Sequence, residues 1–155
     1  MAADVGAKAP DFTLPNQDRE AVTLSEQVQK GPVVLAFVPA AFSGVCTKEL
    51  CTFRDSLAEL TKVNATVLGI SVDTFFTLKA WGDAQGYTFP LLSDFNKTVI
   101  RDFGVFNEDM IGLKGIARRA VFVIDRNGIV RHREVLDDAR NEPDYGKVKA
   151  ALAAL

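Results

Sequence analysis

The run VVLAFVP, from Val33 to Pro39, limits the folds open to this chain more than any other feature. It is continuously apolar and rich in β-branched residues, which is typical of a strand buried on both faces of a sheet. Directly after it, apolar side chains recur at helical spacing and predict a helix from Cys46 to Lys62. The positions that recur are Cys46, Leu50, Phe53, Leu57 and Leu60. A buried strand that leads into a helix indicates an α/β protein.

The rest of the chain continues this alternation of strands and helices. Near the start, DFTLPNQDREAVTLSE predicts an N-terminal hairpin around the polar turn Asn16 to Glu20. TVLGISVD predicts a second buried strand, followed by a helix with Thr74 or Asp73 as N-cap and Gly86 as its stop. Further elements are a strand in FPLLSD, a helix in NKTVIRDFG with Asn96 near its cap, a loop at residues 107–118, a hairpin in AVFVIDRNGIVRHREV and a final amphipathic helix from Asp144 to Leu155. We therefore expect one domain over residues 1–155, with a mixed central β-sheet flanked by helices.

Composition narrows the class of function. The chain has 155 residues and a formal net charge of −2, which argues against a nucleic-acid or membrane-surface role. The first residues lack the basic and apolar regions of a secretory signal, and no apolar run reaches about 18 residues, so no membrane span is expected. We therefore expect a cytoplasmic location. Thiols are kept reduced there, so two nearby cysteines favour redox or metal chemistry over a structural disulfide.

Cys46 lies where the buried strand gives way to the helix. A buried, structural role is the common alternative for a cysteine on a helix. The position favours reactivity, however, because functional sites form at the carboxyl ends of strands in open α/β sheets. Unpaired N–H groups in the first helical turn also stabilise a thiolate, which is the nucleophilic form. Pro39 and Gly44 shape the loop before it, and Ser43 places a hydroxyl three residues before the sulfur.

Cys51 follows five positions after Cys46. On an intact helix the two would lie about 140° apart, with Cα atoms about 8.7 Å apart. A disulfide needs about 7 Å or less, so the pair can close only if the first turns unwind. Cys51 is thus either a resolving thiol that acts through local unfolding or a buried apolar residue. A zinc site would need two more ligands, and His132, the single histidine, is expected to be a solvated strand residue, so no metal is expected.

Charged and aromatic residues near this region leave alternatives open. Arg118 and Arg119 meet the start of a strand and must point to opposite faces, but alternation alone does not choose between them. Glu49, one turn after Cys46, could orient an arginine or be an exposed helix glutamate. Phe42 and Trp81 are expected in the core or in the wall of a pocket.

The stretch Pro39-Ala-Ala-Phe-Ser43-Gly-Val-Cys46 resembles the peroxiredoxin signature Pro-x-x-x-Thr/Ser-x-x-Cys. The resemblance extends over nearly the whole chain. Its further landmarks, in the usual order, are APDFTL, ISVD, the helix that holds Trp81, FPLLSD, GVF and FVIDRNGIVR. It implies a thioredoxin-like fold and a thiol peroxidase that reduces hydrogen peroxide and organic hydroperoxides without a metal or organic cofactor.

By this resemblance Cys46 is the peroxidatic cysteine and passes through a sulfenic acid. Pro39 would shield it, and Ser43 takes the place usually held by a threonine that binds the peroxide. The family's arginine falls on Arg119 by its offset from AVFVID, and Glu49 would brace it.

The subclass that the resemblance implies is mixed. GYTFPLLSDF, GVFNE and GIARRAVFVIDRNGIVR look most like the alkyl hydroperoxide reductase E class, often one-cysteine. The Cys-x4-Cys spacing looks like the peroxiredoxin Q class, in which Cys51 would resolve Cys46 and a thioredoxin- or glutaredoxin-like protein would reduce the disulfide. External thiol resolution and a redox sensor or relay are the alternatives. Many relatives form homodimers, which Phe42 or Phe106 could support.

Overall fold

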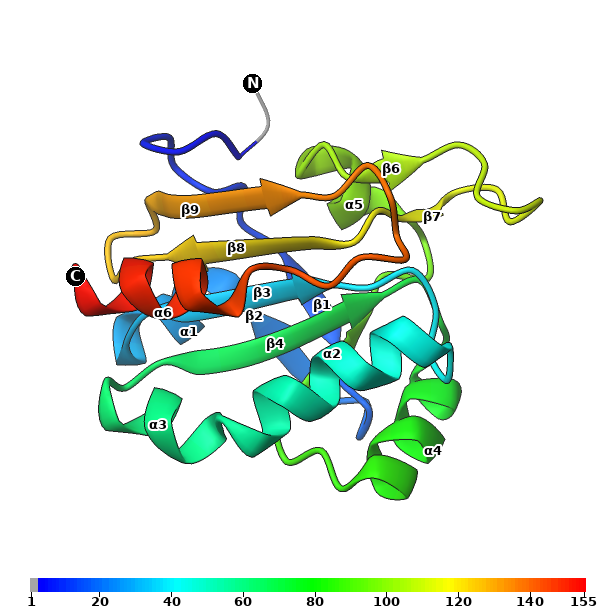
Figure 1. Ribbon diagram of the computed structural model, residues 1–155, viewed down its shortest axis with the longest axis horizontal. Coiled ribbons are helices and arrows are strands. Elements are labelled where there is room, and N and C mark those ends of the chain that lie inside the picture. Colours follow the sequence, from blue (N-terminus) through cyan, green and yellow to red (C-terminus); the bar gives the residue numbers. More distant parts are fainter. Residues whose placement is uncertain (1–2) are drawn as a thin grey trace.

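The computed structural model describes residues 3–155, and a mixed five-stranded sheet forms its centre (Figure 1). The strands lie in the order β5-β4-β3-β8-β9. β3 pairs in parallel with β4, and β4 with β5, whereas β8 runs antiparallel to both β3 and β9. The bounds are β3 Val33–Phe37, β4 Thr66–Ser71, β5 Leu91–Ser93, β8 Ala120–Ile124 and β9 Val130–Val135. The expected mixed sheet is confirmed.

Side chains of the central strand alternate between two cores. Val34 and Ala36 of β3 pack in one apolar cluster, and Val33, Leu35 and Phe37 pack in the other. All five are fully buried. Because both faces of the sheet are covered, the sequence of this strand shows a continuous apolar run instead of alternation.

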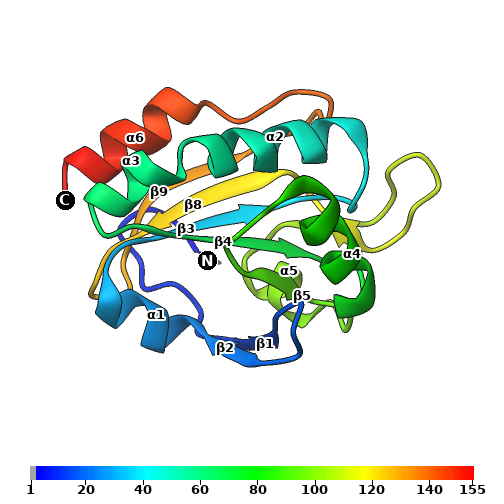
Figure 2. The same cartoon turned by 90° about the horizontal axis from the view of Figure 1, so that it is seen from below.

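Helices cover the two faces of the sheet (Figure 2). α2, α3 and α6 lie on one face, and Leu78 and Trp81 of α4 join the same cluster. α1, α5 and the β1–β2 hairpin lie on the other face. The bounds are β1 Thr13–Pro15, β2 Ala21–Thr23, α1 Leu24–Lys30, α2 Gly44–Asp55, α3 Leu57–Lys62, α4 Phe75–Gln85, α5 Thr98–Asp102 and α6 Tyr145–Ala153.

Two expected helix boundaries are confirmed by their caps. Thr74 caps α4, its hydroxyl accepting from the Thr77 N–H at 3.3 Å, and Gly86 ends the helix with φ +69°. Asp144 caps α6 in the same way through the Lys147 N–H.

The helix expected over residues 46–62 is wrong in two respects. It starts at Gly44, and Ser56 divides it into α2 and α3. Ser56 has φ −93° and ψ 0°, the bridge region that ends one helical turn and redirects the chain. Apolar spacing carries across such a break and therefore does not reveal it.

The loop expected at residues 107–118 is also partly wrong. β6 (Phe106–Asn107) and β7 (Ile116–Ala117) pair as a small antiparallel hairpin. Figure 1 shows this hairpin standing out from the body at the same end of the sheet as the start of α2.

The expected position of Asn96 near the cap of α5 is confirmed, because it precedes the N-cap residue Lys97, whose side chain makes no capping bond. Asp94 instead satisfies the first donors, its carboxylate accepting from the N–H groups of Thr98, Val99 and Ile100. Among the helices of residues 3–155, none is long and apolar enough to cross a membrane.

Candidate active site

Cys46 lies in the first turn of α2, just beyond the carboxyl end of β3. Its thiol is free and the residue is fully buried. The Arg119 guanidinium donates a hydrogen bond from Nη2 to Cys46 Sγ at 3.3 Å. The buried sulfur thus lies in the first turn of a helix and next to a guanidinium, both of which are sources of positive charge.

Arg119 precedes β8 and is held in place by two further groups. Nε and Nη2 donate to the Ala139 carbonyl at 3.1 and 2.9 Å, and Nη1 donates to Glu49 Oε1 at 3.3 Å. Arg118 instead lies partly exposed, 3.8 Å from the Asp137 carboxylate. The structure therefore brings Arg119, and not Arg118, to the sulfur.

Glu49 is fully buried, so the alternative of an exposed helix glutamate is wrong. Burial raises the pKa of its carboxyl to about 8, while the charge and hydrogen bond of Arg119 act in the opposite direction. Its Oε2 atom has no hydrogen-bond partner among residues 3–155. Glu49 thus restrains Arg119 through one oxygen only.

The loop before α2 carries Pro39 and Ser43. Pro39 is buried, and Ser43 is the N-cap residue of α2. The Ser43 hydroxyl makes no capping bond and donates to the Ala40 carbonyl at 2.8 Å. Its hydrogen is therefore engaged, and its oxygen is left as an acceptor.

Phe42 and Trp81 take different positions. Phe42 has φ +66° and is 53% exposed, with its ring centroid 6.3 Å from that of Trp81. Trp81 is fully buried, and its indole N–H donates to Thr47 Oγ1 at 3.2 Å. Trp81 is thus a core residue that also holds the turn of α2 next to Cys46.

Cys51 lies on the same helix as Cys46 and is also a free thiol. It is partly buried, with Tyr87 Oη at 3.5 Å and Gln85 Oε1 at 3.6 Å from Sγ. Tyr87 Oη also donates to the Thr47 carbonyl at 3.1 Å. Tyr87 therefore connects the surroundings of Cys51 to the first turn of α2.

Several of these groups carry no signal in the sequence. Ala139 acts through its backbone, which any residue supplies, and Thr47 and Tyr87 meet only after folding. The sequence indicates Asp73 only as a possible helix cap, yet its carboxylate accepts from the Ala41 N–H of the loop at 2.7 Å. The loop before Cys46 is thereby tied to the end of β4.

A cavity of about 700 Å³ leads to the site. Pro39, Ser43 and Arg119 line its inner end, and residues of the β6–β7 hairpin line its outer part. Phe42 and Trp81 are not among its lining residues. The fully buried sulfur of Cys46 is thus approached through the loop and the arginine.

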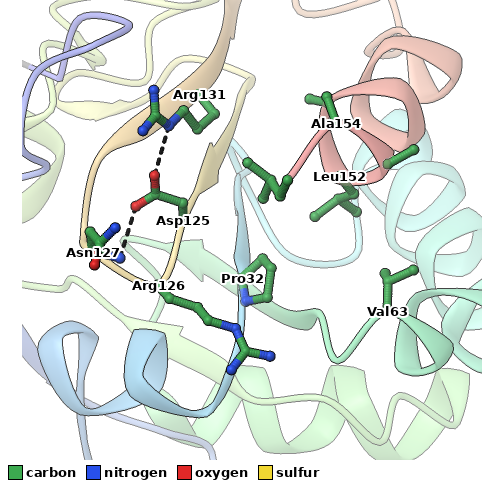
Figure 3. A pocket seen from close by; sticks show the side chains of 11 residues that line it. Pro32, Val63, Asp125, Arg126, Asn127, Arg131, Leu152 and Ala154 are labelled. Carbon is green, nitrogen blue, oxygen red and sulfur yellow. Dashed lines mark hydrogen bonds and ion pairs between the residues drawn. The ribbon is translucent and has the colours of Figure 1, made fainter.

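A second cavity, of about 730 Å³, lies at the opposite end of the sheet (Figure 3). Figure 3 shows Arg131 directed to Asp125, and their Nε and Oδ2 atoms are 2.7 Å apart. Asp125 also accepts from the Asn127 and Ile129 N–H groups, so it organises the β8–β9 turn. This cavity contains no part of the thiol site.

His132 departs from the expectation of a solvated residue. It is partly buried, burial lowers its pKa, and its Nε2 atom has no hydrogen-bond partner among residues 3–155. Over the same range, no group of three His, Cys, Asp or Glu side chains is arranged to hold a metal ion.

Solved structures show the same arrangement of sheet and helices. The crystal structure of peroxidoxin BcpB from Mycobacterium tuberculosis matches with a TM-score of 0.88 and 35% identity, covering 97% of each chain. The expected thioredoxin-like fold of a peroxiredoxin is therefore confirmed.

Sequence comparison gives the family. The model described as the AhpC/TSA family matches residues 5–133. Alkyl hydroperoxide reductase E from Mycobacterium tuberculosis is 43% identical over 155 residues, covering 97% of this chain and 99% of the relative. A chloroplastic 2-cysteine peroxiredoxin from Chattonella marina var. antiqua is 37% identical over 166 residues, covering 100% of this chain and 80% of the relative. The chain belongs to the AhpC/TSA family of peroxiredoxins.

Proposed function

We propose that this protein is a thiol-dependent peroxidase that reduces hydrogen peroxide and organic hydroperoxides, with Cys46 as the peroxidatic cysteine. The observation that carries the proposal is the contact between Arg119 Nη2 and Cys46 Sγ in the first turn of α2. The contact supplies a positive charge to the nucleophile and a donor beside the position that a peroxide must take. Family membership supports the same reaction.

In the first step the Cys46 thiolate attacks the terminal oxygen of the hydroperoxide. A sulfur–oxygen bond forms as the oxygen–oxygen bond breaks, which gives a sulfenic acid and an alkoxide or hydroxide that then takes a proton. Arg119 and the first-turn N–H groups of Val45 and Cys46 stabilise the charge on the leaving oxygen. The Ser43 oxygen accepts from the peroxide hydroxyl, since its own hydrogen is donated to Ala40.

In the second step the Cys51 thiol condenses with the sulfenic acid, which forms a disulfide and releases water. Both cysteines lie within α2, so its first turn must open before the sulfurs meet. The bonds from Trp81 and Tyr87 to Thr47 oppose this opening. A thioredoxin- or glutaredoxin-like dithiol then reduces the disulfide by exchange and is itself oxidised.

Direct reduction of the Cys46 sulfenic acid by an external thiol is the alternative. It is favoured if the helix opens too slowly for Cys51 to react. A redox relay, in which the oxidised protein passes a disulfide to a partner, uses the same residues.

A homodimer is the assembly that the surface favours. Phe42, Phe76 and Phe95 are each more than half exposed, and the last two line one cavity. Phe106 is less suited to a contact, because the Arg101 guanidinium lies 3.9 Å from its ring centroid. Sedimentation analysis of the wild type and of Phe42→Ser tests this surface.

Peroxide consumption by variants tests the reaction. Cys46→Ser should abolish it, and retained turnover would refute the proposal. Arg119→Ala should slow oxidation of Cys46 by about a hundredfold or more, since one such donor is worth that much. Arg118→Ala is the matched control and should change the rate little; the reverse order would reassign the arginine.

Mass analysis after one equivalent of peroxide tests resolution. The wild type should lose two hydrogens through an intramolecular disulfide, and Cys51→Ser should instead retain an added oxygen on Cys46. A wild-type product with only sulfenic or sulfinic acid would favour an external thiol over Cys51.

A further inference from the structure

The tip of the β6–β7 hairpin has an unfavourable backbone conformation. Met110 and Leu113 exchange two backbone hydrogen bonds, of 3.0 and 2.9 Å, around Ile111 and Gly112. Both central residues have positive φ, +51° and +88°. A two-residue turn of this kind strongly favours Asn-Gly, and a β-branched residue at positive φ is a genuine outlier.

Packing in the core does not account for Ile111. Its side chain is 89% exposed, and that of Leu113 is 46% exposed. Polar groups nearby hold the turn in place, since the Asp109 carboxylate accepts from the Gly112 N–H at 2.9 Å. The chain therefore displays a strained, apolar tip to solvent, and strain of this kind concentrates at functional sites.

This tip forms part of the cavity that leads to the thiol. Met110, Ile111 and Leu113 line the cavity together with Ser43 and Arg119. Val45, Leu136 and Ala139 add further apolar wall. The cavity thus has a polar inner end at the arginine and an apolar outer part at the hairpin.

Charges at the mouth of the cavity largely cancel. Arg140 pairs with Asp138 at 2.7 Å, and Arg118 lies 3.8 Å from Asp137. The mouth therefore offers no uniform charge to select an ionic substrate, and apolar contact remains as the means of discrimination.

We infer that the hairpin tip is a subsite for the uncharged, apolar part of an organic hydroperoxide, with Ile111 as its specificity-determining residue. The inference rests on the proposed peroxidase function. A hydroperoxide with its reacting oxygens at Arg119 can extend its body along this cavity, which brings that body against the tip. Burial of Ile111 and Leu113 against that body favours it over hydrogen peroxide, which has no apolar part.

Ile111→Asn tests the subsite, because asparagine fits the turn but lacks the apolar surface. We expect the ratio of kcat/KM for cumene hydroperoxide to that for hydrogen peroxide to fall about fivefold, the effect of partly burying one isoleucine. At the same time the Tm should rise by about 2–4 °C as the strain is relieved. Leu113→Ser, which leaves the turn residues in place, should lower the same ratio.

Arg19→Asn is the matched control. Arg19 also has positive φ, +63°, in the turn between β1 and β2, but it does not line the cavity. Its replacement should raise the Tm without changing the ratio.

Three results would overturn the inference. An unchanged ratio in both tip variants, with hydrogen peroxide still consumed, would remove the subsite and leave the proposed function standing. A changed oligomeric state with an unchanged ratio would make the tip a protein contact instead. Failure of the wild type to consume either peroxide would overturn both proposals.

Discussion

Replacing Glu49 by glutamine should change how the stability of this protein depends on pH. Burial raises the pKa of Glu49 from 4.5 to about 8, against the opposing effect of Arg119. Such a carboxyl binds its proton more tightly in the folded than in the unfolded chain. Its contribution to stability is therefore complete below about pH 4.5 and is lost as the pH rises through 8.

The size of this loss follows from the pKa difference, because each unit corresponds to about 1.4 kcal/mol. Between about pH 5.5 and pH 8.5 the wild-type carboxyl should cost about 3 kcal/mol of unfolding free energy. Glutamine resembles the protonated acid in shape and does not ionise. The excess of the variant's unfolding free energy over the parent's should therefore grow by about 3 kcal/mol from the lower to the higher pH.

Urea denaturation at several pH values measures this difference. Both proteins should carry Cys46→Ser, so that the thiol beside Arg119 plays no part in the comparison. All other titrating groups are shared and cancel in the comparison. A difference that stays constant within about 0.5 kcal/mol would mean that Arg119 keeps Glu49 ionised throughout, and the reasoning would be refuted.

Two other substitutions probe the surroundings of the site, and a third, at Gly31, probes the fold at the opposite end of β3. Tyr87→Phe removes the hydrogen bond to the Thr47 carbonyl, so the first turn of α2 should open more easily. The intramolecular disulfide should then form about fivefold faster, as measured by rapid-quench mass analysis. A slower rate of disulfide formation would contradict this. Asp73→Ala should release the loop before Cys46 and reduce peroxide turnover more than the Tm, while the asparagine variant should recover part of the rate. Gly31→Ala should destabilise the fold by about 3 kcal/mol in urea, because its Cβ would overlap the Asn64 carbonyl oxygen; a change below about 0.5 kcal/mol would be inconsistent.

The sheet could be predicted from sequence because its signals are local. The run at Val33–Phe37 is apolar throughout because both faces are covered, and the same holds for β8 and for Val67–Ile70 within β4. The caps at Thr74 and Asp144 act over three residues, so they too are visible in the sequence. Interactions between residues that are close in the sequence therefore leave a pattern from which the element can be predicted.

Elements that break local rules were missed. Ser56 bends the chain with a residue type common in helices and turns alike, so nothing marks the division of α2 from α3. The β6–β7 hairpin turns at Ile111-Gly112, where Asn-Gly would have indicated it.

The candidate site likewise has some residues that the sequence predicts and others that it does not. The location of Cys46 follows from the strand and helix around it, and the signature motif adds Pro39 and Ser43. The choice between Arg118 and Arg119 needed the family offset, because alternation gives only opposite faces. The contacts of Tyr87 with Thr47 and Cys51 depend on how α4 and its following loop pack, which no spacing reveals.

Arg119 is oriented in part by a main-chain group, and this affects how the site can be dissected. The Ala139 carbonyl accepts two of its hydrogen bonds, and the residue at that position is already alanine. Alanine scanning would therefore not detect the contribution of this carbonyl. Substitutions of the side chain at position 139 would also leave the two hydrogen bonds in place. Replacing the Ala139–Arg140 amide by an ester weakens that carbonyl as an acceptor, so backbone chemistry is the route by which its contribution to catalysis can be measured.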